Sequence, residues 1–518
     1  MATSVTHDPS GPSGHLPFAG SAKGRESVAA SMRYVSTRQG SQGDPGSLGF
    51  EEILLAGLAR DGGLYLPSEW PQLSKREIAE LRDLGYTELA FRIMWPFVEG
   101  AFDEATFRRL IVEAYASFET AEVAPLKPLG EATPTNGGLH LLELFHGPTL
   151  AFKDIALQLL GRLLDQALHA RRQHATIVGA TSGDTGSAAI EAVRDRKTID
   201  IFMLHPQGRV SEVQRRQMTT VMAPNVHNIA VTGTFDDCQD LAKACFNDLA
   251  FRDRHALTAV NSINFARVMA QIVYYFWAAL KLGAPEGPVA FTVPTGNFGN
   301  VYAGYAALRM GLPVHHFVVA SNSNDILARF FDTGRMSIAD VVPTLSPSMD
   351  IQISSNFERL LFDLYDRNGK ALADAMAEFR RTGLLEIGGN AHAAVGALFY
   401  AGRVDDEETV AAIADCRRRF GETLDPHTAV GYAVAQRHRR EASVPMVVLA
   451  TAHPAKFPDA VARATGERPR LPERLADLMN RAERLEGLPN DLGALEALID
   501  ERMTLARPAA PLRAKVPL

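Results

Sequence analysis

Lys153 is the residue whose type and surroundings point most directly to chemistry. It lies in the segment Phe152-Lys153-Asp154, which follows an apolar run over residues 139–145. The apolar neighbours predict partial burial, and burial lowers the pKa of an amine and makes it a better nucleophile and base. Such a lysine is a candidate for the Schiff base with an aldehyde cofactor. An ordinary surface lysine is the alternative.

Two glycine-containing loops follow expected strands downstream of Lys153. They are Thr-Ser-Gly-Asp-Thr-Gly from Thr181 to Gly186, and Gly-Asn-Phe-Gly-Asn from Gly296 to Asn300. In open α/β sheets, ligands bind beyond the carboxyl ends of strands, where the next helix presents free N–H groups. The second loop combines glycines with amide donors, which is typical of a phosphate-binding turn. Taken alone, it is equally compatible with a tight strand-to-helix turn.

Two further segments carry polar residues at expected element boundaries. Asn261 or Ser262 is a natural N-cap of the apolar helix that follows, and Arg267 begins the apolar part of that helix. A forked guanidinium there favours recognition of a dianion such as a phosphate ester over a structural ion pair. Thr451 follows the apolar run 447–450, where a hydroxyl can share a hydrogen bond with a neutral ring nitrogen.

Composition and charge exclude several classes of function. The formal net charge of -7 gives no electrostatic reason to bind nucleic acid. The loop Gly183-Asp184-Thr185-Gly186 lacks the third glycine of a dinucleotide loop, and no Walker sequence occurs. Three cysteines without ligand spacing suggest neither a disulfide framework nor a metal site, and they favour a cytoplasmic protein. The apolar stretch 268–280 is too short for a bilayer span and is expected to be a buried helix.

The pattern along the 518 residues predicts several domains, because the chain is too long for one ordinary core. Short β-branched runs alternate with amphipathic ones, which predicts a parallel sheet wrapped by helices. Strands are expected at 139–145, 176–180, 199–204, 226–231, 257–260, 289–293, 314–320 and 446–450. The expected organisation is a disordered extension over 1–31, a helical N-terminal domain over 32–125, an α/β catalytic region over 126–470 with a smaller subdomain at roughly 150–270, and a helical tail over 471–518.

Together these motifs resemble the threonine synthases of the branch that carries an extra N-terminal domain. The resemblance starts at Met32 to Arg38, passes through Phe50 to Tyr65, and extends to about residue 465. It implies an α/β protein of the fold-type II pyridoxal-phosphate class, similar to the β-subunit of tryptophan synthase. That fold has two α/β domains with mainly parallel sheets flanked by helices, here with a helical N-terminal domain. The implied cofactor is pyridoxal 5'-phosphate, with no metal, no membrane partner, and a monomer or homodimer.

The resemblance also implies a role for each motif. Lys153 matches the lysine that forms the Schiff base, and Asp184 stands where many relatives have an asparagine that donates to the cofactor's phenolic oxygen, which a carboxylate cannot do. Contacts to the cofactor are expected from Lys153, Asp184, Gly296, Asn297, Phe298, Gly299, Asn300 and Thr451. Contacts to the substrate are expected from Thr181, Ser182, Thr185, Asn261, Ser262 and Arg267.

The implied reaction converts O-phospho-L-homoserine and water into L-threonine and phosphate by γ-elimination and β-addition of water. It is the last step of threonine biosynthesis, carried out by a carbon–oxygen lyase. Two alternatives remain open on the residues alone. A serine/threonine dehydratase or a cysteine-synthase-like enzyme has no use for an anion site around Arg267. A non-catalytic binder of a phosphorylated metabolite has no use for Lys153.

Overall fold

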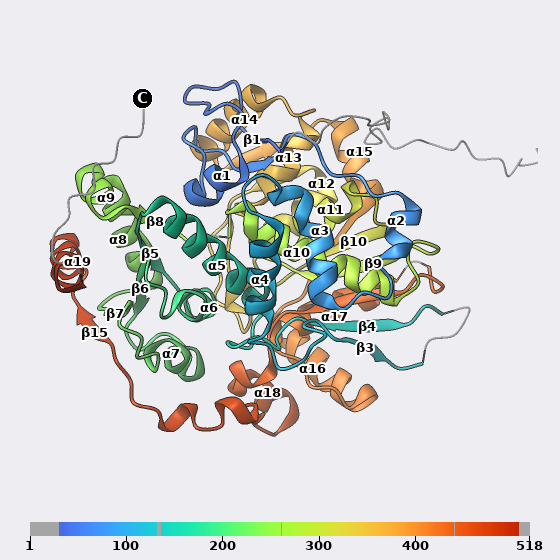
Figure 1. Ribbon diagram of the computed structural model, residues 1–518. Coiled ribbons are helices and arrows are strands. Elements are labelled where there is room, and N and C mark those ends of the chain that lie inside the picture. The colour runs from blue at the N-terminus through green and yellow to red at the C-terminus, as the bar shows by residue number, and fades with distance from the viewer. Residues whose placement is uncertain (1–30, 132–135, 261, 440, 507–518) are drawn as a thin grey trace, which may run out of the picture.

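The computed structural model describes residues 31–131, 136–260, 262–439 and 441–506. Residues 1–30 of the predicted extension, Asn261 and residues 507–518 of the predicted tail lie outside the described residues. Two separate sheets form the body of the molecule, with helices between and around them (Figure 1). Within the described ranges, no helix combines the length and the apolar character that a membrane crossing needs.

The larger sheet has six strands in the order β13-β10-β9-β14-β4-β3. All neighbouring strands run parallel except β3, which pairs antiparallel with β4 at one edge. Every residue of β9 and β14 is buried, which explains why these strands appear as continuous apolar runs in the sequence. The strands span Leu126–Leu129 (β3), Leu139–Glu143 (β4), Val289–Pro294 (β9), Val314–Ser321 (β10), Phe399–Arg403 (β13) and Met446–Ala450 (β14).

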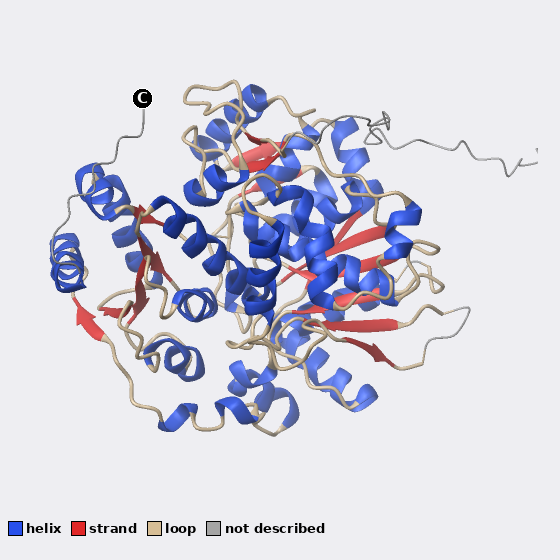
Figure 2. Ribbon diagram, viewed as in Figure 1, coloured by secondary structure: helices blue, strands red, loops and turns tan. Residues whose placement is uncertain are grey.

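The smaller sheet has five parallel strands in the order β15-β7-β6-β5-β8. One face packs against helices α8 and α19, and the other faces helices α5 and α6. In Figure 2 the two groups of strands stand apart, with helices filling the space between them. These elements span Ala175–Ala180 (β5), Ile199–Pro206 (β6), Val226–Val231 (β7), Leu257–Thr258 (β8), Glu486–Leu488 (β15), Lys153–Arg171 (α5), Asp184–Val193 (α6), Phe235–Asn247 (α8) and Leu492–Ala506 (α19).

Helix α10 (Phe265–Lys281) is the central helix of the molecule. It is buried over almost its whole length and contacts α3 of the N-terminal domain, α5 and α11. The N-terminal domain adds a short antiparallel pair, β1 and β2. The elements of the N-terminal domain, together with α11, span Tyr34–Ser36 (β1), Phe50–Ala56 (α1), Tyr65–Pro67 (β2), Lys75–Glu80 (α2), Tyr86–Val98 (α3), Glu104–Tyr115 (α4) and Gly299–Arg309 (α11).

The remaining elements complete the layers around the two sheets. Helix α17 packs on the face of the larger sheet opposite α10. Helix α16 packs against α17, and α18 packs against α16. These elements span Glu212–Thr219 (α7), Leu249–His255 (α9), Ile326–Thr333 (α12), Arg335–Ser337 (β11), Pro347–Met349 (η1), Phe357–Leu364 (α13), Gly369–Thr382 (α14), Leu384–Glu386 (β12), Gly389–Leu398 (α15), Asp406–Phe420 (α16), Pro426–Arg437 (α17), Pro454–Lys456 (η2), Pro458–Thr465 (α18), Glu473–Leu475 (η3) and Leu478–Asn480 (η4).

The structure contains strands at all eight places where the sequence predicts one, and the buried helix over 268–280 lies inside α10. The tail that is expected to be helical also contains a strand that the sequence analysis does not predict. Residues 486–488 form β15, which extends the smaller sheet beside β7. Three residues at a sheet edge are too few to show the alternation of apolar and polar residues that marks a strand.

Gly161 shows how closely the smaller sheet's helices approach each other. A β-carbon at this position of α5 would collide with the backbone carbonyl of Ala192 on α6. Contacts between these two helices are among the most extensive in the molecule. The missing side chain therefore sets the distance between α5 and α6.

We expect Gly161→Val to lower the free energy of unfolding by about 1–3 kcal/mol, because the added carbons force the two helices apart. Chemical denaturation followed by circular dichroism measures this change. Gly287→Val is the matched control, since a β-carbon at Gly287 has no atom of the described chain within 4 Å. Equal stability of the two variants would show that α5 and α6 are free to separate.

Candidate active site

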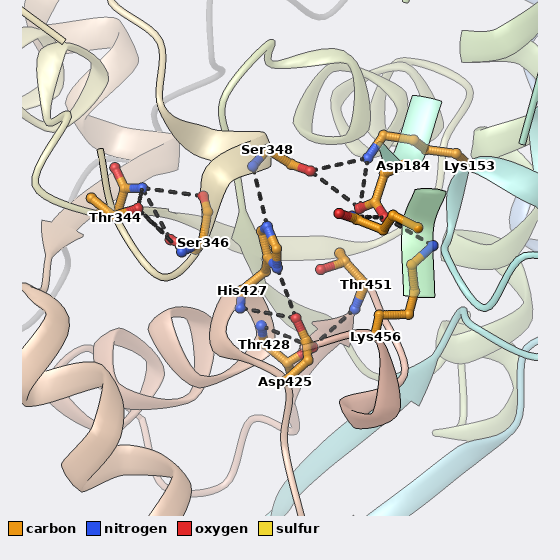
Figure 3. A network of polar contacts seen from close by, with 12 residues as sticks. Lys153, Asp184, Thr344, Ser346, Ser348, Asp425, His427, Thr428, Thr451 and Lys456 are labelled. Atoms are coloured by element: carbon orange, nitrogen blue, oxygen red, sulfur yellow. Dashed lines mark hydrogen bonds and ion pairs between the residues drawn. The ribbon is translucent and has the colours of Figure 1, made fainter. Parts of the chain in front are cut away.

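Four segments meet at Lys153, and they come from both sheets (Figure 3). Lys153 is the first residue of α5, and Asp184 is the first residue of α6. Ser348 lies in η1, and Lys456 ends η2, which follows strand β14 of the larger sheet. The site therefore lies where the loops after strands of the two sheets face each other, as expected for an α/β protein.

The amine of Lys153 is buried and held by two oxygens. The residue is 7% exposed, and its Nζ lies 3.3 Å from Oδ2 of Asp184 and 3.4 Å from Oγ of Ser348. Burial lowers the pKa of Lys153 below its ordinary value, and the negative charge of Asp184 opposes this effect. The predicted burial of Lys153 is confirmed, and its direction of shift suits a nucleophile or base.

Asp184 is a buried carboxylate that accepts hydrogen bonds from four side chains. Its Oδ1 lies 2.8 Å from Nζ of Lys456 and 2.8 Å from Nε2 of Gln214. Its Oδ2 accepts from Lys153 and, at 3.2 Å, from Ser348. Burial alone would raise the pKa of Asp184, but the charges of Lys456 and Lys153 hold it well below its ordinary value. The residue is therefore an anion in the folded protein.

A chain of hydrogen bonds fixes the segment beside Lys153. The backbone N–H of Ser348 donates to Nε2 of His427 at 3.3 Å, and Nδ1 of His427 lies 2.9 Å from Oδ1 of Asp425. The proton of the imidazole is therefore on Nδ1, facing the carboxylate. Asp425 also accepts from the hydroxyl of Thr428, whose oxygen accepts from the backbone N–H of Thr451 at 3.1 Å.

Thr451 lies at the end of β14, as the sequence predicts, and is 5% exposed. Its carbonyl accepts from the backbone N–H of Phe152 at 2.9 Å. This bond ties the residue before Lys153 to the end of the larger sheet. The threonine side chain is thereby placed next to the lysine segment, as the labelled sticks show (Figure 3).

The loop from Gly296 to Asn300 lies against the Ser348 segment. A β-carbon at Gly296 would lie 2.9 Å from the carbonyl oxygen of Ser348. Asn300 is 5% exposed, and its Oδ1 accepts from the hydroxyls of Tyr274 and Tyr275. Its Nδ2 is buried without a hydrogen-bond partner among the described residues. A buried amide donor of this kind needs an acceptor from a ligand.

Phe298 and Asn297 anchor the same loop from its other side. Phe298 has a left-handed backbone with a φ of 60°, and its buried ring packs edge-on against Phe357. The carbonyl of Asn297 accepts at 3.1 Å from the backbone N–H and from the side-chain amide of Asn356. The packing of the Phe298 ring on Phe357 and the hydrogen bonds from Asn356 hold the backbone of the loop in place. The side chain of Phe298 itself packs in the core.

Arg267 is a buried cation with no ion pair to any residue that the structure describes. It is 4% exposed, and its Nε and Nη1 have no hydrogen-bond partner within the described ranges. Burial lowers the pKa of Arg267 to about 10. Its positive charge also lowers the pKa of Lys153, so the two cations are close enough to interact electrostatically. An unpaired buried guanidinium is costly, and a bound anion would offset that cost.

The N-cap of α10 differs from the prediction. Asn264 is the capping residue, and its Oδ1 accepts from the backbone N–H of Ala266 at 3.1 Å. The prediction that Asn261 or Ser262 caps this helix is wrong, because the helix begins only at Phe265. Ser262 is half-buried, and its carbonyl lies 3.9 Å from a β-carbon built on Gly299. The segment before α10 therefore adjoins the Gly296–Asn300 loop.

The Thr181 loop is shaped by its own threonine. The hydroxyl oxygen of Thr181 accepts from the backbone N–H groups of Gly183 and Gly186, both at 2.9 Å. Ser182 is exposed and Thr185 is half-buried, so both are open to a ligand. Helix α6 begins at Asp184, within this loop. The turn therefore leads directly into the helix whose first residue contacts Lys153.

Comparison with known proteins agrees with this site. A family model described as "Pyridoxal-phosphate dependent enzyme" matches residues 120–403. The residues fit that cofactor: Lys153 offers an amine to its aldehyde, and the Asn300 amide offers a donor to its phosphate. The protein is therefore an enzyme of the pyridoxal-phosphate-dependent class.

Two further family models and one relative identify the family within this class. Models for the threonine synthase N terminus and the threonine synthase C-terminal part match residues 33–115 and 428–499. The chain is 54% identical over 478 residues to the threonine synthase of Pseudomonas aeruginosa, covering 92% of this chain and 100% of the relative. The chain belongs to the threonine synthase family.

Solved structures give the same result. A threonine synthase from Brucella melitensis with bound pyridoxal phosphate has a TM-score of 0.88 and 51% identity, over 91% of this chain and 99% of that chain. The yeast threonine synthase has a TM-score of 0.86 and 39% identity, over 92% of this chain and 100% of that chain. These values fix the fold-type II architecture and the cofactor of the family.

Several residues of the site were not found from the sequence. Gln214, Ser348 and His427 lie in segments with no local signal of chemistry, and only the fold brings them to Asp184 and Lys153. Lys456 carried a usable signal. It lies between Ala455 and Phe457, an apolar setting like that of Lys153, and five residues after Thr451.

Proposed function

We propose that this chain converts O-phospho-L-homoserine and water into L-threonine and inorganic phosphate, with Lys153 as its catalytic residue. One observation supports this reaction over other reactions of the same fold. The buried guanidinium of Arg267 has no ion-pair partner within the described ranges, and its charge acts on the Lys153 amine. A substrate without a second anion would leave this charge unmatched.

The residues that hold the cofactor follow from the contacts described above. Bound pyridoxal 5'-phosphate supplies the electron withdrawal that makes the substrate's α-hydrogen acidic. We assign its phosphate to the loop from Gly296 to Asn300, where the Asn300 amide is the unpartnered donor. Thr451 is assigned to the ring nitrogen, because its hydroxyl is uncharged and its backbone is fixed by Thr428 and Phe152. Asp184 acts behind Lys153 as the buried anion.

Lys153 is placed to move protons. Its Nζ lies between a carboxylate and a hydroxyl, and burial lowers its pKa, which favours the neutral amine that can accept a proton. We propose that it takes the proton from the substrate's α-carbon and returns protons at the neighbouring carbons. Asp184 and Ser348 orient the amine while it does so.

Arg267 and its neighbours form the pocket for the substrate phosphate. The guanidinium binds the ester, and it stabilises the charge of the departing phosphate more strongly as that charge grows. Ser262 and Asn261 precede the same helix and are proposed as further contacts, and Asn261 lies outside the described residues. Thr181, Ser182 and Thr185 are proposed to surround the substrate carboxylate, with the N–H groups at the start of α6 facing it.

The setting and assembly of the protein are also proposals. Three free cysteines, Cys238, Cys245 and Cys416, are all buried, and burial raises the pKa of each thiol. Thiols of this kind are compatible with a cytoplasmic location. A monomer or a homodimer is proposed for the assembly.

We expect Lys153→Ala to abolish turnover and to leave the fold intact, because Asp184 keeps its bonds to Lys456 and Gln214. Coupled measurement of phosphate and threonine released from phosphohomoserine gives the activity, and circular dichroism gives the fold. Borohydride reduction of the wild-type holoenzyme followed by mass spectrometry should place the pyridoxyl group on Lys153. Threonine formation by the alanine variant would remove the lysine from its role.

We expect Arg267→Leu to lower kcat/KM for phosphohomoserine by about 10- to 100-fold, since a charge-assisted hydrogen bond contributes roughly 1.5–3 kcal/mol. Cofactor retention should change far less. Arg76→Leu is the control, because this arginine is exposed and pairs only with Glu80 among the described residues. Equal loss of cofactor and of substrate use would make Arg267 a structural residue.

We expect Gly299→Val to weaken cofactor retention. A β-carbon at Gly299 already approaches Nδ2 of Asn356 to 3.2 Å, so a larger side chain displaces the loop that is proposed to hold the phosphate. Cofactor content after gel filtration, read from its absorbance, measures the effect. Full occupancy in the variant would move the phosphate site away from this loop.

A further inference from the structure

Asp184 is one buried carboxylate between two buried lysines. Lys456 is 0% exposed and Lys153 is 7% exposed. Their amines lie 2.8 Å and 3.3 Å from the carboxylate, on Oδ1 and Oδ2 respectively. Within the described ranges, neither lysine forms an ion pair with any other carboxylate. The proposed function uses Lys153 and leaves the second lysine without a role.

The two oxygens of the carboxylate have different surroundings. Oδ1 is held by Lys456 and Gln214, and Oδ2 faces Lys153 and Ser348 (Figure 3). Lys456 is itself anchored, since its Nζ also donates to the carbonyl of Thr149 at 2.7 Å. One side of Asp184 is therefore fixed by the structure, and the other side is presented to the catalytic amine.

The charges of the three groups do not balance when both lysines are protonated. Two ammonium groups then share one carboxylate, and the site carries an excess positive charge away from water. Lys456 is the nearer cation and also donates to a backbone carbonyl, whereas Lys153 has, besides the carboxylate, only a longer contact with the Ser348 hydroxyl. The excess is removed most easily by releasing the proton of Lys153.

We propose that Lys456 is a positioning residue for the reaction: it neutralises Asp184 and so leaves the Lys153 amine free to lose its proton. Without Lys456, the carboxylate would have Lys153 as its only cation in contact and would stabilise the ammonium form. An ammonium group has no lone pair and acts neither as nucleophile nor as base. This inference rests on the proposed role of Lys153.

The other charged groups around the site act in the same sense. Burial lowers the pKa of Lys153, Asp184 raises it, and the charges of Lys456 and Arg267, the latter on α10, lower it. On the side of the larger sheet, a protonated His427 of α17 would add positive charge beside Asp184. Among the described groups with the largest effects, Asp184 raises the pKa of the amine through both its charge and a hydrogen bond.

Asp154 is the remaining carboxylate that faces Lys456. It is fully buried and accepts from the N–H and the hydroxyl of Thr149. Burial raises its pKa to about 6, although Thr149 and the charge of Lys456 oppose this shift. Asp154 already has two donors, and it does not form an ion pair with Lys456 within the described ranges.

The test follows the protonation of Lys153 without measuring turnover. Full-length protein freed of cofactor is mixed with pyridoxal phosphate across a pH series and quenched with borohydride at short times. Mass spectrometry of the Lys153 peptide gives the rate of labelling at each pH. The variants are Lys456→Met, Asp184→Asn and the double variant, with Lys281→Met as a control that removes a half-exposed lysine.

The midpoint of the labelling profile should move to higher pH in Lys456→Met, because the uncompensated carboxylate then stabilises the ammonium form. It should move to lower pH in Asp184→Asn, and the control should match the wild type. The pH profile of kcat/KM should shift in the same directions. A Lys456→Met midpoint equal to that of the wild type would refute the inference, whatever the overall rate.

A second comparison covers the case in which Lys456→Met does not fold. The carbonyl of Thr149 keeps its bond from Gln217 when Lys456 is removed, but Asp184 would be left short of a cation. Asp184→Asn and the double variant avoid that cost. The double variant should have nearly the midpoint of Asp184→Asn, because the proposed effect of Lys456 passes through the Asp184 carboxylate, and a large difference between the two would overturn the inference. Label absent from Lys153 in the wild type would instead refute the proposed function.

Discussion

The carboxylate of Asp184 is the group on which the arrangement of the site depends, because a buried charge must be matched by donors. Its four donors come from α5, α7, η1 and η2, which are far apart in the sequence. Asp184 is the first residue of α6, which packs on the smaller sheet, whereas Lys456 follows β14 of the larger sheet. The ion pairs therefore join the two halves of the molecule at the point where the reacting groups must meet.

Two kinds of donor surround the site. The loop from Gly296 to Asn300 offers uncharged donors, whereas the start of α10 offers the cation Arg267. A second buried arginine stands behind both. Arg359 donates to the carbonyls of Tyr65 and Ile263 and to the side chain of Asn356, which holds the Gly296–Asn300 loop. The N-terminal domain thereby takes part in fixing the segments on which both phosphates are proposed to bind.

The sequence predicted well what depends on local pattern. The eight predicted strands and the burial of Lys153 followed from runs of apolar residues, which mark buried parallel strands and their flanking loops. The predictions failed where neighbours in space decide the outcome. Asn264 caps α10 instead of Asn261 or Ser262, since the helix starts where Leu54 can accept from the Asn264 amide. The contacts of Ser348 and Gln214 depend on tertiary packing, and no spacing in the chain reveals them.

Strand β15 has a consequence for the order in which the chain can fold. The smaller sheet takes four strands from residues 175–258 but receives its fifth from residues 486–488, and α19 then covers the face above β7. During synthesis, the edge of β7 and the apolar side of α8 stay uncovered until more than two hundred further residues have left the ribosome. The larger sheet has all its strands once residues 446–450 have been made, so the sheet whose layer carries Asp184 receives its last strand later.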